Sequence, residues 1–242
     1  MRRKGGETES LFGGDQVSVS PHWNRAPGRG GIIFYLFLLL SIFLLLSNSL
    51  PGASLFLLHV LSLSIMNQFL ADLASKKPAP GGGSASAMAG AMAAGLVRKV
   101  CLLTIGKKKY QSVAERFSQL NQEAEELQKA LLQLVKEDEK AFLEVLKTKG
   151  SEKAVKRAAE VPLETATKSL AVLKMANYAS KKGNQNLRSD AFCAVELATA
   201  SIYGALENVR ANLPFLKDEK DSAELKDKIN KLLDGTEVLV KP

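Results

Sequence analysis

The chain has 242 residues, of which 46% are hydrophobic and 24% are charged, as is ordinary for a globular protein of one or two domains. Its net charge is +8, but the lysines after Met66 alternate with glutamates, which is typical of solvated helix faces and not of a nucleic-acid-binding surface. The two histidines, His22 and His59, both precede Met66. The part predicted to fold, residues 66–242, therefore contains no histidine. This excludes histidine-based acid–base catalysis, Ser–His–Asp triads and ordinary zinc sites there.

Residues 1–65 differ sharply in composition from the rest. Residues 1–29 show no apolar period and are predicted to be disordered, whereas the uncharged run 31–50 is long enough to cross a bilayer. A second apolar run covers residues 54–65. We favour a translated extension that is not native to the protein, with a true membrane anchor as the alternative; a signal peptide fits poorly. We therefore predict two parts, a non-globular extension (1–65) and a helical domain (66–242), in a cytoplasmic protein that is membrane-anchored only if residues 31–65 are native.

A glycine-rich stretch, Pro78 to Ser84, separates a short helix near residues 67–74 from a helix of Ala, Gly and Met predicted over about 82–103. Gly81, Gly82 and Gly83 leave backbone N–H groups accessible, and the positive end of the following helix suits an anion. Ser84 is a candidate helix cap. A linker before a tightly packed core helix is the alternative. The stretch matches neither a Walker loop nor a dinucleotide-binding fingerprint.

A long helix is predicted over about 110–147, because apolar residues recur at spacings of four and three. They are Val113, Phe117, Leu120, Ala124, Leu127, Leu131, Leu134, Phe142 and Val145. Asp138 occupies the next position of this stripe after Leu134. A buried carboxylate costs several kcal/mol unless it is paired or hydrogen-bonded, and burial raises its pKa. Asp138 is thus a candidate acid–base, or else a structural residue that reaches water or pairs with a lysine.

The remaining helices follow from Gly, Pro and polar breaks. A helix capped by Ser151 is expected to end near Glu160 and to restart at Val161–Pro162, since proline is tolerated in a first helical turn. A polar loop over 184–190, with Ser189 as its expected cap, precedes a helix that ends at Pro214, and a last helix covers about 218–239. No segment has a strand pattern, so we predict an all-α bundle of about six to seven helices.

Two further features concern the small and polar residues of these helices. One stripe of the helix after residue 189 carries Asp190, Ala194, Leu197, Ser201, Gly204, Asn208 and Ala211. Such a stripe lines a cleft or lets a neighbouring helix approach closely.

Cys101 and Cys193 both lie in apolar, helix-like surroundings, which predicts buried free thiols in a reducing compartment.

Six motifs occur in one order along the chain: PAPGGGSASA, LTIGKKKY, EDEKAF, VPLE, KGNQNLRSDA and NVRANL. In that order and spacing, residues 66–242 resemble the C-terminal domain family of formiminotransferase-cyclodeaminase, which includes stand-alone methenyltetrahydrofolate cyclohydrolases. The resemblance implies an all-helical homodimer with a folate-binding crevice. It implies a tetrahydrofolate derivative, polyglutamylated or not, as substrate. We expect no bound prosthetic group, and the residue composition predicts no metal and no nucleic-acid partner.

The resemblance also implies a reaction. The leading expectation is that the protein cyclises 5-formiminotetrahydrofolate to 5,10-methenyltetrahydrofolate and releases ammonia. The first alternative is a cyclohydrolase that interconverts 5,10-methenyl- and 10-formyltetrahydrofolate. The second is a catalytically inactive, membrane-anchored helical scaffold, which would bind no folate.

With no histidine available, carboxylates are the expected acid–base groups. Asp190 is the first choice, because it lies in a polar loop at the start of a helix. Asp138 is the second choice. The alternative for Asp190 is that it has no catalytic role and is a first-turn residue favoured by the helix dipole. The residues expected to orient the pterin and the reacting carbon are Asn186, Ser189, Asn208 and Arg210. A cationic track for the glutamate tail is expected from Lys107, Lys108 and Lys109. Backbone donors are expected from Gly81, Gly82, Gly83 and Ser84. The alternatives are a solvated helix end for the lysines and an interface for Asn208 and Arg210.

Overall fold

The computed structural model describes residues 65–240, which belong to the second of two units into which the chain divides, Ser64–Pro242. The predictions for residues 1–64, including the apolar runs, lie outside the described residues. Five long helices make up most of the described part: α3 (Gly82–Leu102), α4 (Ala114–Lys147), α5 (Glu152–Lys182), α6 (Arg188–Asn212) and α7 (Glu219–Val240). A short helix covers residues 65–73, and 3₁₀ helices cover Lys108–Val113, Gln185–Leu187 and Leu213–Phe215. No strand occurs within residues 65–240, so the predicted all-α class is confirmed.

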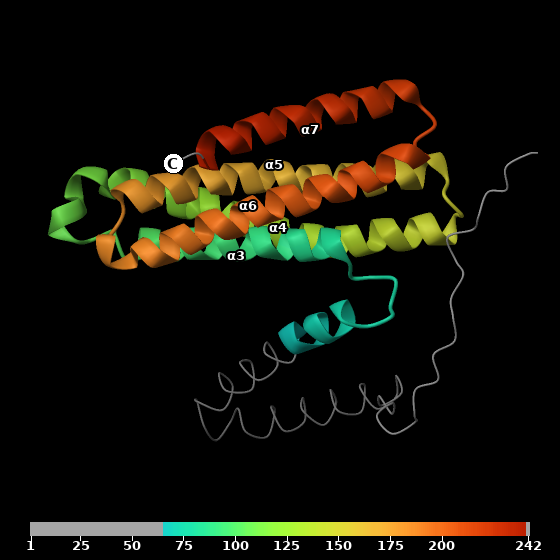
Figure 1. The fold of residues 1–242 in the computed structure, drawn as a ribbon. Coiled ribbons are helices and arrows are strands. Elements are labelled where there is room, and N and C mark those ends of the chain that lie inside the picture. The colour runs from blue at the N-terminus through green and yellow to red at the C-terminus, as the bar shows by residue number, and fades with distance from the viewer. Residues whose placement is uncertain (1–64, 241–242) are drawn as a thin grey trace, which may run out of the picture. The chain divides into compact units, whose positions relative to one another are not determined.

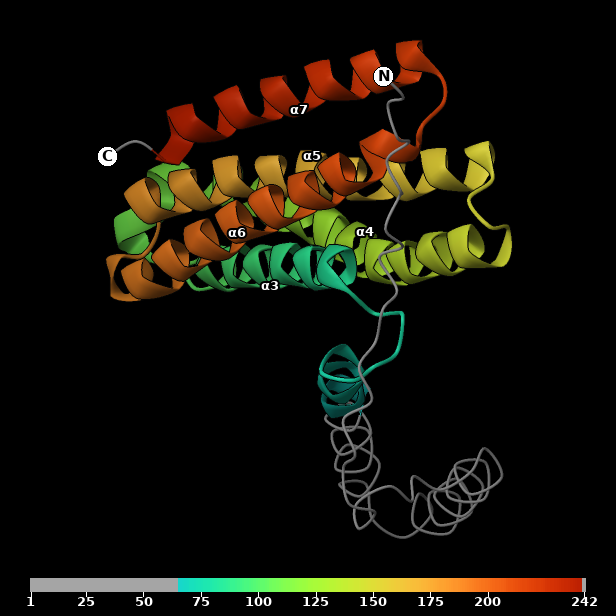
Figure 2. The same cartoon turned by 45° about the vertical axis from the view of Figure 1, so that its right-hand side comes forward.

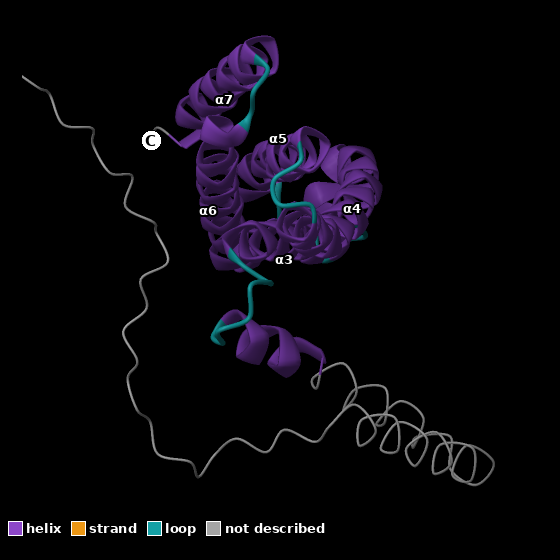
Figure 3. Cartoon of the chain, turned by 90° about the vertical axis from the view of Figure 1, so that its right-hand side faces the viewer, coloured by secondary structure: helices purple, strands orange, loops and turns teal. Residues whose placement is uncertain are grey.

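Helices α3, α4, α5 and α6 form a bundle in which consecutive helices run in opposite directions (Figure 1). Seen end-on, the four helices surround one core, and α7 lies outside it against α5 and α6 (Figure 3). Helix α7 is on the side of the bundle away from α3 (Figure 2). It packs through the buried residues Leu225, Ile229 and Thr236. The core is therefore a four-helix core with one covering helix.

Small residues let the central helices approach closely. Gly90 of α3 faces Ser169 of α5 and Ser201 of α6, and an added Cβ would lie 2.5 Å and 2.8 Å from their hydroxyl oxygens. These two hydroxyl groups are hydrogen-bonded to each other at 2.7 Å, and the Ser201 hydroxyl donates to the Ser86 carbonyl at 2.6 Å. Gly204 leaves room in the same way for the Ser86 hydroxyl. The small-residue stripe of α6 thus serves close helix packing over this part of its length.

Helix α3 is the one helix within residues 65–240 that is long and apolar enough to span a membrane. Half of that apolar window is buried inside the structure, and Ala87, Ala94 and Val97 are completely covered. Its apolar character is therefore accounted for by its place in the core of the bundle.

The predicted break near Glu160 is wrong. Helix α5 runs without interruption from Glu152 to Lys182, with Pro162 inside it. Proline has no N–H group, so the carbonyl of Ala158, four residues earlier, lacks its usual partner. The side-chain amide of Asn212 on α6 donates to that carbonyl at 3.1 Å. A partner from another helix thus satisfies the carbonyl that the proline leaves free.

The start of α3 near Gly82 is confirmed, but its cap residue and the start of α6 differ from prediction. Gly81, not Ser84, is the cap residue of α3, and α6 begins at Arg188, before Ser189. The 3₁₀ turn before α6 is capped by the Asn184 side chain, which accepts from the Asn186 N–H at 3.2 Å and so replaces the expected serine cap.

The cysteines differ from each other. Both are free, but only Cys101 is buried, and burial raises the pKa of its thiol to about 12. Cys193 is exposed, because it lies beside the exposed Phe192 on the outer side of α6, whereas Ala191 and Ala194 face the core. The prediction of a buried thiol is therefore wrong for Cys193.

Candidate active site at the start of helix α3

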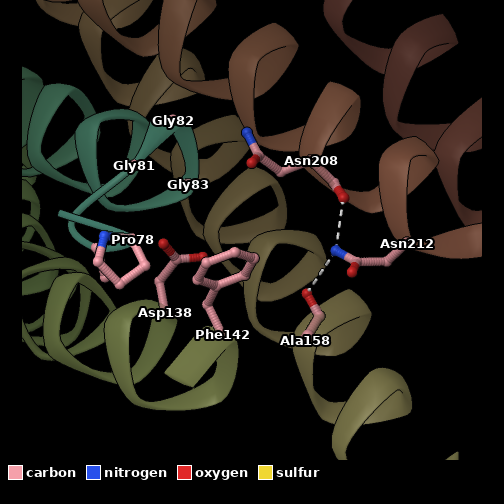
Figure 4. Close-up of a pocket in the computed structure, with 10 residues that line it drawn as sticks. Pro78, Gly81, Gly82, Gly83, Asp138, Phe142, Ala158, Asn208 and Asn212 are labelled. Atoms are coloured by element: carbon pink, nitrogen blue, oxygen red, sulfur yellow. Dashed lines mark hydrogen bonds between the residues drawn. The ribbon is translucent and has the colours of Figure 1, made fainter. Parts of the chain in front are cut away.

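A cavity of about 230 Å³ lies where the glycine-rich stretch enters α3 (Figure 4). It is lined by Pro78, Ala79, Gly81, Gly82, Gly83, Asp138, Phe142, Ala158, Asn208 and Asn212. The glycine-rich stretch, α4, α5 and the last turns of α6 all contribute, so four parts of the bundle position the cavity lining. Ligand pockets for whole drug-sized molecules typically measure about 300–1,000 Å³. This cavity therefore suits part of a larger ligand, such as one ring system.

Asp138 is the only ionisable residue in this lining. Its carboxylate accepts a hydrogen bond from the Ser84 hydroxyl at 2.7 Å and another from the backbone N–H of Ser84. Both donors belong to the first turn of α3, whose free N–H groups carry partial positive charge. Asp138 thus takes the capping role that no residue of the α3 sequence itself fills.

Gly83 is required by this arrangement. A Cβ at position 83 would lie 2.1 Å from Oδ1 of Asp138, a distance at which the carboxylate has to move. Gly81, in contrast, has open space around the position of a Cβ. The three glycines therefore differ in function, and Gly83 is the one that admits the carboxylate.

Burial raises the pKa of Asp138 above its ordinary value of 3.8, and the two hydrogen bonds from Ser84 counteract this in part. Burial also raises the pKa of Glu139, with further contributions from the negative charges of Asp138 and Asp72. Asp138 therefore holds a proton more readily than a solvated aspartate does. This is the property that general acid–base catalysis near neutral pH requires.

Two asparagines from the end of α6 form the opposite wall (Figure 4). The Asn208 amide donates to the Gly204 carbonyl at 2.8 Å, and its nitrogen lies 3.2 Å from the position of a Cβ on Gly82. The Asn212 amide donates to the carbonyls of Asn208, at 2.9 Å, and Ala158. Phe142, whose side chain is 42% exposed, lies beside Asp138.

Sequence reasoning missed Phe142 and Asn212 as cavity residues. The apolar stripe predicts Phe142 in the core, but Phe142 lies one turn after Asp138 and shares its face of α4. Asn212 is four residues after Asn208, so the two amides necessarily share a face of α6. That spacing was the available signal.

The other predicted site residues lie elsewhere. Asp190 is in the first turn of α6 and pairs with Lys99 at 3.1 Å. Roughly 27 Å of helix separates it from Asn208, at about 1.5 Å per residue. The residues that cluster with it at this end of the bundle are all exposed: Asn186, Ser189, Lys107, Lys108 and Lys109. The single crevice expected from the motifs is therefore not formed within one chain, because α6 carries its two polar groups at opposite ends.

Arg210 is exposed and pairs with Glu207 on the outer side of α6, so it does not line the cavity. Within residues 65–240, no group of three or more His, Cys, Asp or Glu side chains is placed to hold a metal ion.

An all-helical bundle whose cavity holds one half-buried carboxylate defines a class of small-molecule-binding helical proteins able to perform carboxylate acid–base chemistry. A family model described as formiminotransferase-cyclodeaminase matches residues 65–231. The chain therefore belongs to the formiminotransferase-cyclodeaminase family, as its motifs predicted.

The chain is similar to several characterised members. It is 38% identical over 171 residues to methenyltetrahydrofolate cyclohydrolase from Methylorubrum extorquens, covering 64% of this chain and 82% of that protein. It is 34% identical over 164 residues to formimidoyltransferase-cyclodeaminase from Dictyostelium discoideum, but spans only 30% of that longer protein. The crystal structure of formiminotetrahydrofolate cyclodeaminase from Thermotoga maritima superposes with a TM-score of 0.68 at 30% identity, covering 70% of this chain and 89% of that one.

Proposed function

We propose that the cavity binds a tetrahydrofolate derivative and that the chain cyclises 5-formiminotetrahydrofolate to 5,10-methenyltetrahydrofolate with release of ammonia. The observation that carries the proposal is Asp138, a half-buried carboxylate with a raised pKa that lines a cavity at a helix start. The folate chemistry is supported by the names of the relatives, which are cyclodeaminases and a cyclohydrolase. These comparisons give no support to an inactive membrane-anchored scaffold.

The reaction needs one group that both accepts and donates a proton. The aniline nitrogen of the folate attacks the carbon of the protonated formimino group and forms the new carbon–nitrogen bond. Asp138 takes the proton that this nitrogen loses and delivers it to the departing nitrogen. The old carbon–nitrogen bond then breaks, ammonia leaves and the methenyl cation remains, so no net proton is consumed. Acid–base assistance of this kind typically contributes about 100- to 10,000-fold.

This assignment reverses the order expected from the sequence, which placed Asp190 before Asp138. Asp138 lies in the cavity, whereas Asp190 is paired with Lys99 at the far end of α6. Asn208 and the backbone N–H groups from Gly81 to Gly83 are the other groups of the cavity that we propose contact the substrate, whereas Ser84 is fully buried and donates to Asp138. The proposed mechanism uses neither a histidine side chain nor a metal ion.

For the residues at the other end of the bundle we propose a role through a second copy of the chain. These residues lie at or beyond the ends of α6 and α3 that are away from the cavity, too far to reach the cavity of their own chain: Asp190, Ser189, Asn186 and Lys107 to Lys109. In a homodimer, this end of one chain can face the cavity of the other. The lysines would then meet a glutamate or polyglutamate tail. Such a dimer is proposed to be cytoplasmic, and membrane-anchored only if residues 31–65 are native.

A second candidate function is methenyltetrahydrofolate cyclohydrolase. It is favoured by the relative from Methylorubrum extorquens, which is 38% identical and is matched over 82% of its length. In this reaction, water attacks the methenyl carbon, and Asp138 takes one proton from the water and returns it to the nitrogen that leaves the carbon. The second proton of the water is released to solvent as the formyl carbonyl forms, which balances the positive charge of the methenyl cation. The same carboxylate serves both reactions.

One assay tests both candidates. The full chain is purified and given 5-formiminotetrahydrofolate, with methenyl absorbance and ammonia both recorded, and in parallel 5,10-methenyltetrahydrofolate, with loss of absorbance recorded. We expect methenyl formation with equal release of ammonia. Turnover of the methenyl compound alone would assign the cyclohydrolase activity instead. No turnover of either folate and no folate binding would reject the proposed function.

A further inference from the structure

The carbonyl of Ala158 is an unusual feature of the cavity wall, because it has no donor in its own helix. Pro162 occupies the position whose N–H would bind it. The Asn212 amide donates to it at 3.1 Å, and to the carbonyl of Asn208 at 2.9 Å (Figure 4). Both Ala158 and Asn212 line the cavity. Pro162 is buried behind them and does not line it.

These two bonds settle the orientation of the Asn212 amide. A backbone carbonyl only accepts hydrogen bonds, so the NH₂ group must face both carbonyls. The two N–H bonds are then used, and the remaining polar atom of the side chain is Oδ1, an acceptor. No residue between 65 and 240 donates a hydrogen bond to it. The cavity therefore offers a ligand one acceptor of fixed orientation, which selects an N–H or O–H donor.

Asn212 and Asp138 lie on opposite sides of the cavity, with Phe142 between them (Figure 4). Under the proposed function, the reacting nitrogens of the folate lie at Asp138. The 2-amino group of the pterin lies on the ring furthest from those nitrogens, across a flat bicyclic system. The exposed face of Phe142 suits such a ring.

We propose that Asn212 is a specificity residue whose Oδ1 accepts a hydrogen bond from the 2-amino group of the pterin, and that Pro162 holds it in position by leaving the Ala158 carbonyl free. This rests on the proposed function in one respect, namely that the ligand is a reduced folate. It adds a residue and an orientation that the reaction alone does not specify.

The test measures binding, so it does not depend on turnover. Dissociation constants of the full chain are measured by calorimetry for 5-formyltetrahydrofolate and for its analogue with a methyl group in place of the 2-amino group. The native chain should bind the analogue about tenfold more weakly, because a hydrogen bond is lost and Oδ1 is left unpaired. Asn212→Leu should bind both ligands alike, at the weaker level.

Pro162→Ala is the second variant, because it leaves Asn212 itself unchanged. Alanine restores an N–H that competes for the Ala158 carbonyl, and it favours the helix, so the variant should fold. Its discrimination between the two ligands should fall from about tenfold to less than threefold. A purely structural role for Pro162 would leave that ratio unchanged.

Asn177→Leu is the matched control. The Asn177 amide also donates to a carbonyl of another helix, that of Leu239 at 3.1 Å, but lies outside the cavity. This variant should lose thermal stability and keep the tenfold discrimination.

Equal binding of the two ligands by the native chain, or full discrimination by Asn212→Leu, would overturn the inference even if the chain turns over folate. Discrimination without turnover would reject only the proposed reaction, whereas a chain that binds no reduced folate would overturn both.

Discussion

Asp138 has the position and the environment of an acid–base group, and replacing it separates chemistry from folding. Asp138→Asn should lower kcat by about 100- to 10,000-fold, because an amide neither takes nor delivers the proton. The Ser84 hydroxyl can still donate to the amide oxygen, so helix content should be unchanged. Turnover is measured with 5-formiminotetrahydrofolate, and circular dichroism reports the fold. A loss of less than tenfold would remove Asp138 from the proton-transfer role.

The raised pKa of Asp138 also has a consequence for stability. Between the ordinary value of 3.8 and the raised value in the folded chain, the native state binds more protons than the unfolded state, so stability falls as pH rises through this window. Above the window the native state carries a partly buried charge. Asp138→Asn should therefore raise the melting temperature at pH 7, and this gain should shrink at pH values below about 4. Thermal unfolding at both pH values checks this; an equal gain at both would show that burial does not destabilise the charged form.

Gly83 and Gly81 offer a matched pair of substitutions. Gly83→Ala should abolish turnover, because its Cβ would lie 2.1 Å from Oδ1 of Asp138 and displace the carboxylate. Gly81→Ala should keep turnover within about twofold on steric grounds, since nothing lies near its Cβ position and its φ of −131° suits any residue. kcat/KM of the two variants is compared under identical conditions. Equal effects would mean that the clash at Gly83 is relieved without moving Asp138.

Single residues also show how far the sequence predicts a site. Asp138 was predictable, because a carboxylate interrupts an otherwise apolar stripe. Its hydrogen-bond partner was not, since Ser84 is far away in the chain and reads locally as a helix cap. Asn212 was missed for a related reason, because its amide is ordered by the Ala158 carbonyl, which only the packing of α6 on α5 brings near.

At the scale of helices, two glycines of α3 should respond in opposite ways. Gly90→Ala should destabilise the chain by about 1–3 kcal/mol, because its Cβ would meet two buried hydroxyl groups that are hydrogen-bonded to each other. Gly95→Ala should be neutral or stabilising by up to about 1 kcal/mol, because alanine favours the helix. Its Cβ meets only the amide end of the Gln128 side chain, which can move. Chemical denaturation measures both; destabilisation of similar size would show that α3 tolerates no added methyl group at all.

Helix positions were largely predictable, whereas helix continuity was not. The starts and ends of α3 and α7 follow from periodicity and from Gly and Pro signals, which are local. The continuity of α5 through Pro162 depends on a donor from α6, which is not a local property. The same long-range contact both corrects the fold and builds the cavity wall.

For the whole molecule, α3 and α6 each carry exposed apolar residues that the second chain of the proposed homodimer can cover. Met92, Leu102, Phe192 and Tyr203 are between 40% and 56% exposed. They recur along neighbouring helices, whose contact is direct. Asp190 and Lys99 lie on the same two helices. A twofold arrangement through these two helices would be self-complementary, as closed dimers are.

Mixing two inactive variants tests this proposed homodimer. If Asp138 of one chain acts together with Asp190 of the other, Asp138→Asn and Asp190→Asn should each abolish turnover alone. Chains carrying the two substitutions are co-expressed with different affinity tags. In mixed dimers, one of the two sites contains both native carboxylates and the other contains neither. Random pairing makes about half of the dimers mixed, so about a quarter of the native activity should return.

Each outcome has a distinct meaning for the molecule. Self-mixing of either variant is the control and should give no activity, because every site then lacks one carboxylate. Full activity of Asp190→Asn alone would leave Asp138 as the sole carboxylate and reduce Asp190 to an ion-pair partner of Lys99. Two inactive variants that never complement would place both groups in one functional unit within a chain. The roughly 27 Å of helix between the ends of α6 argues against that last result, because one pteridine ring cannot bridge it.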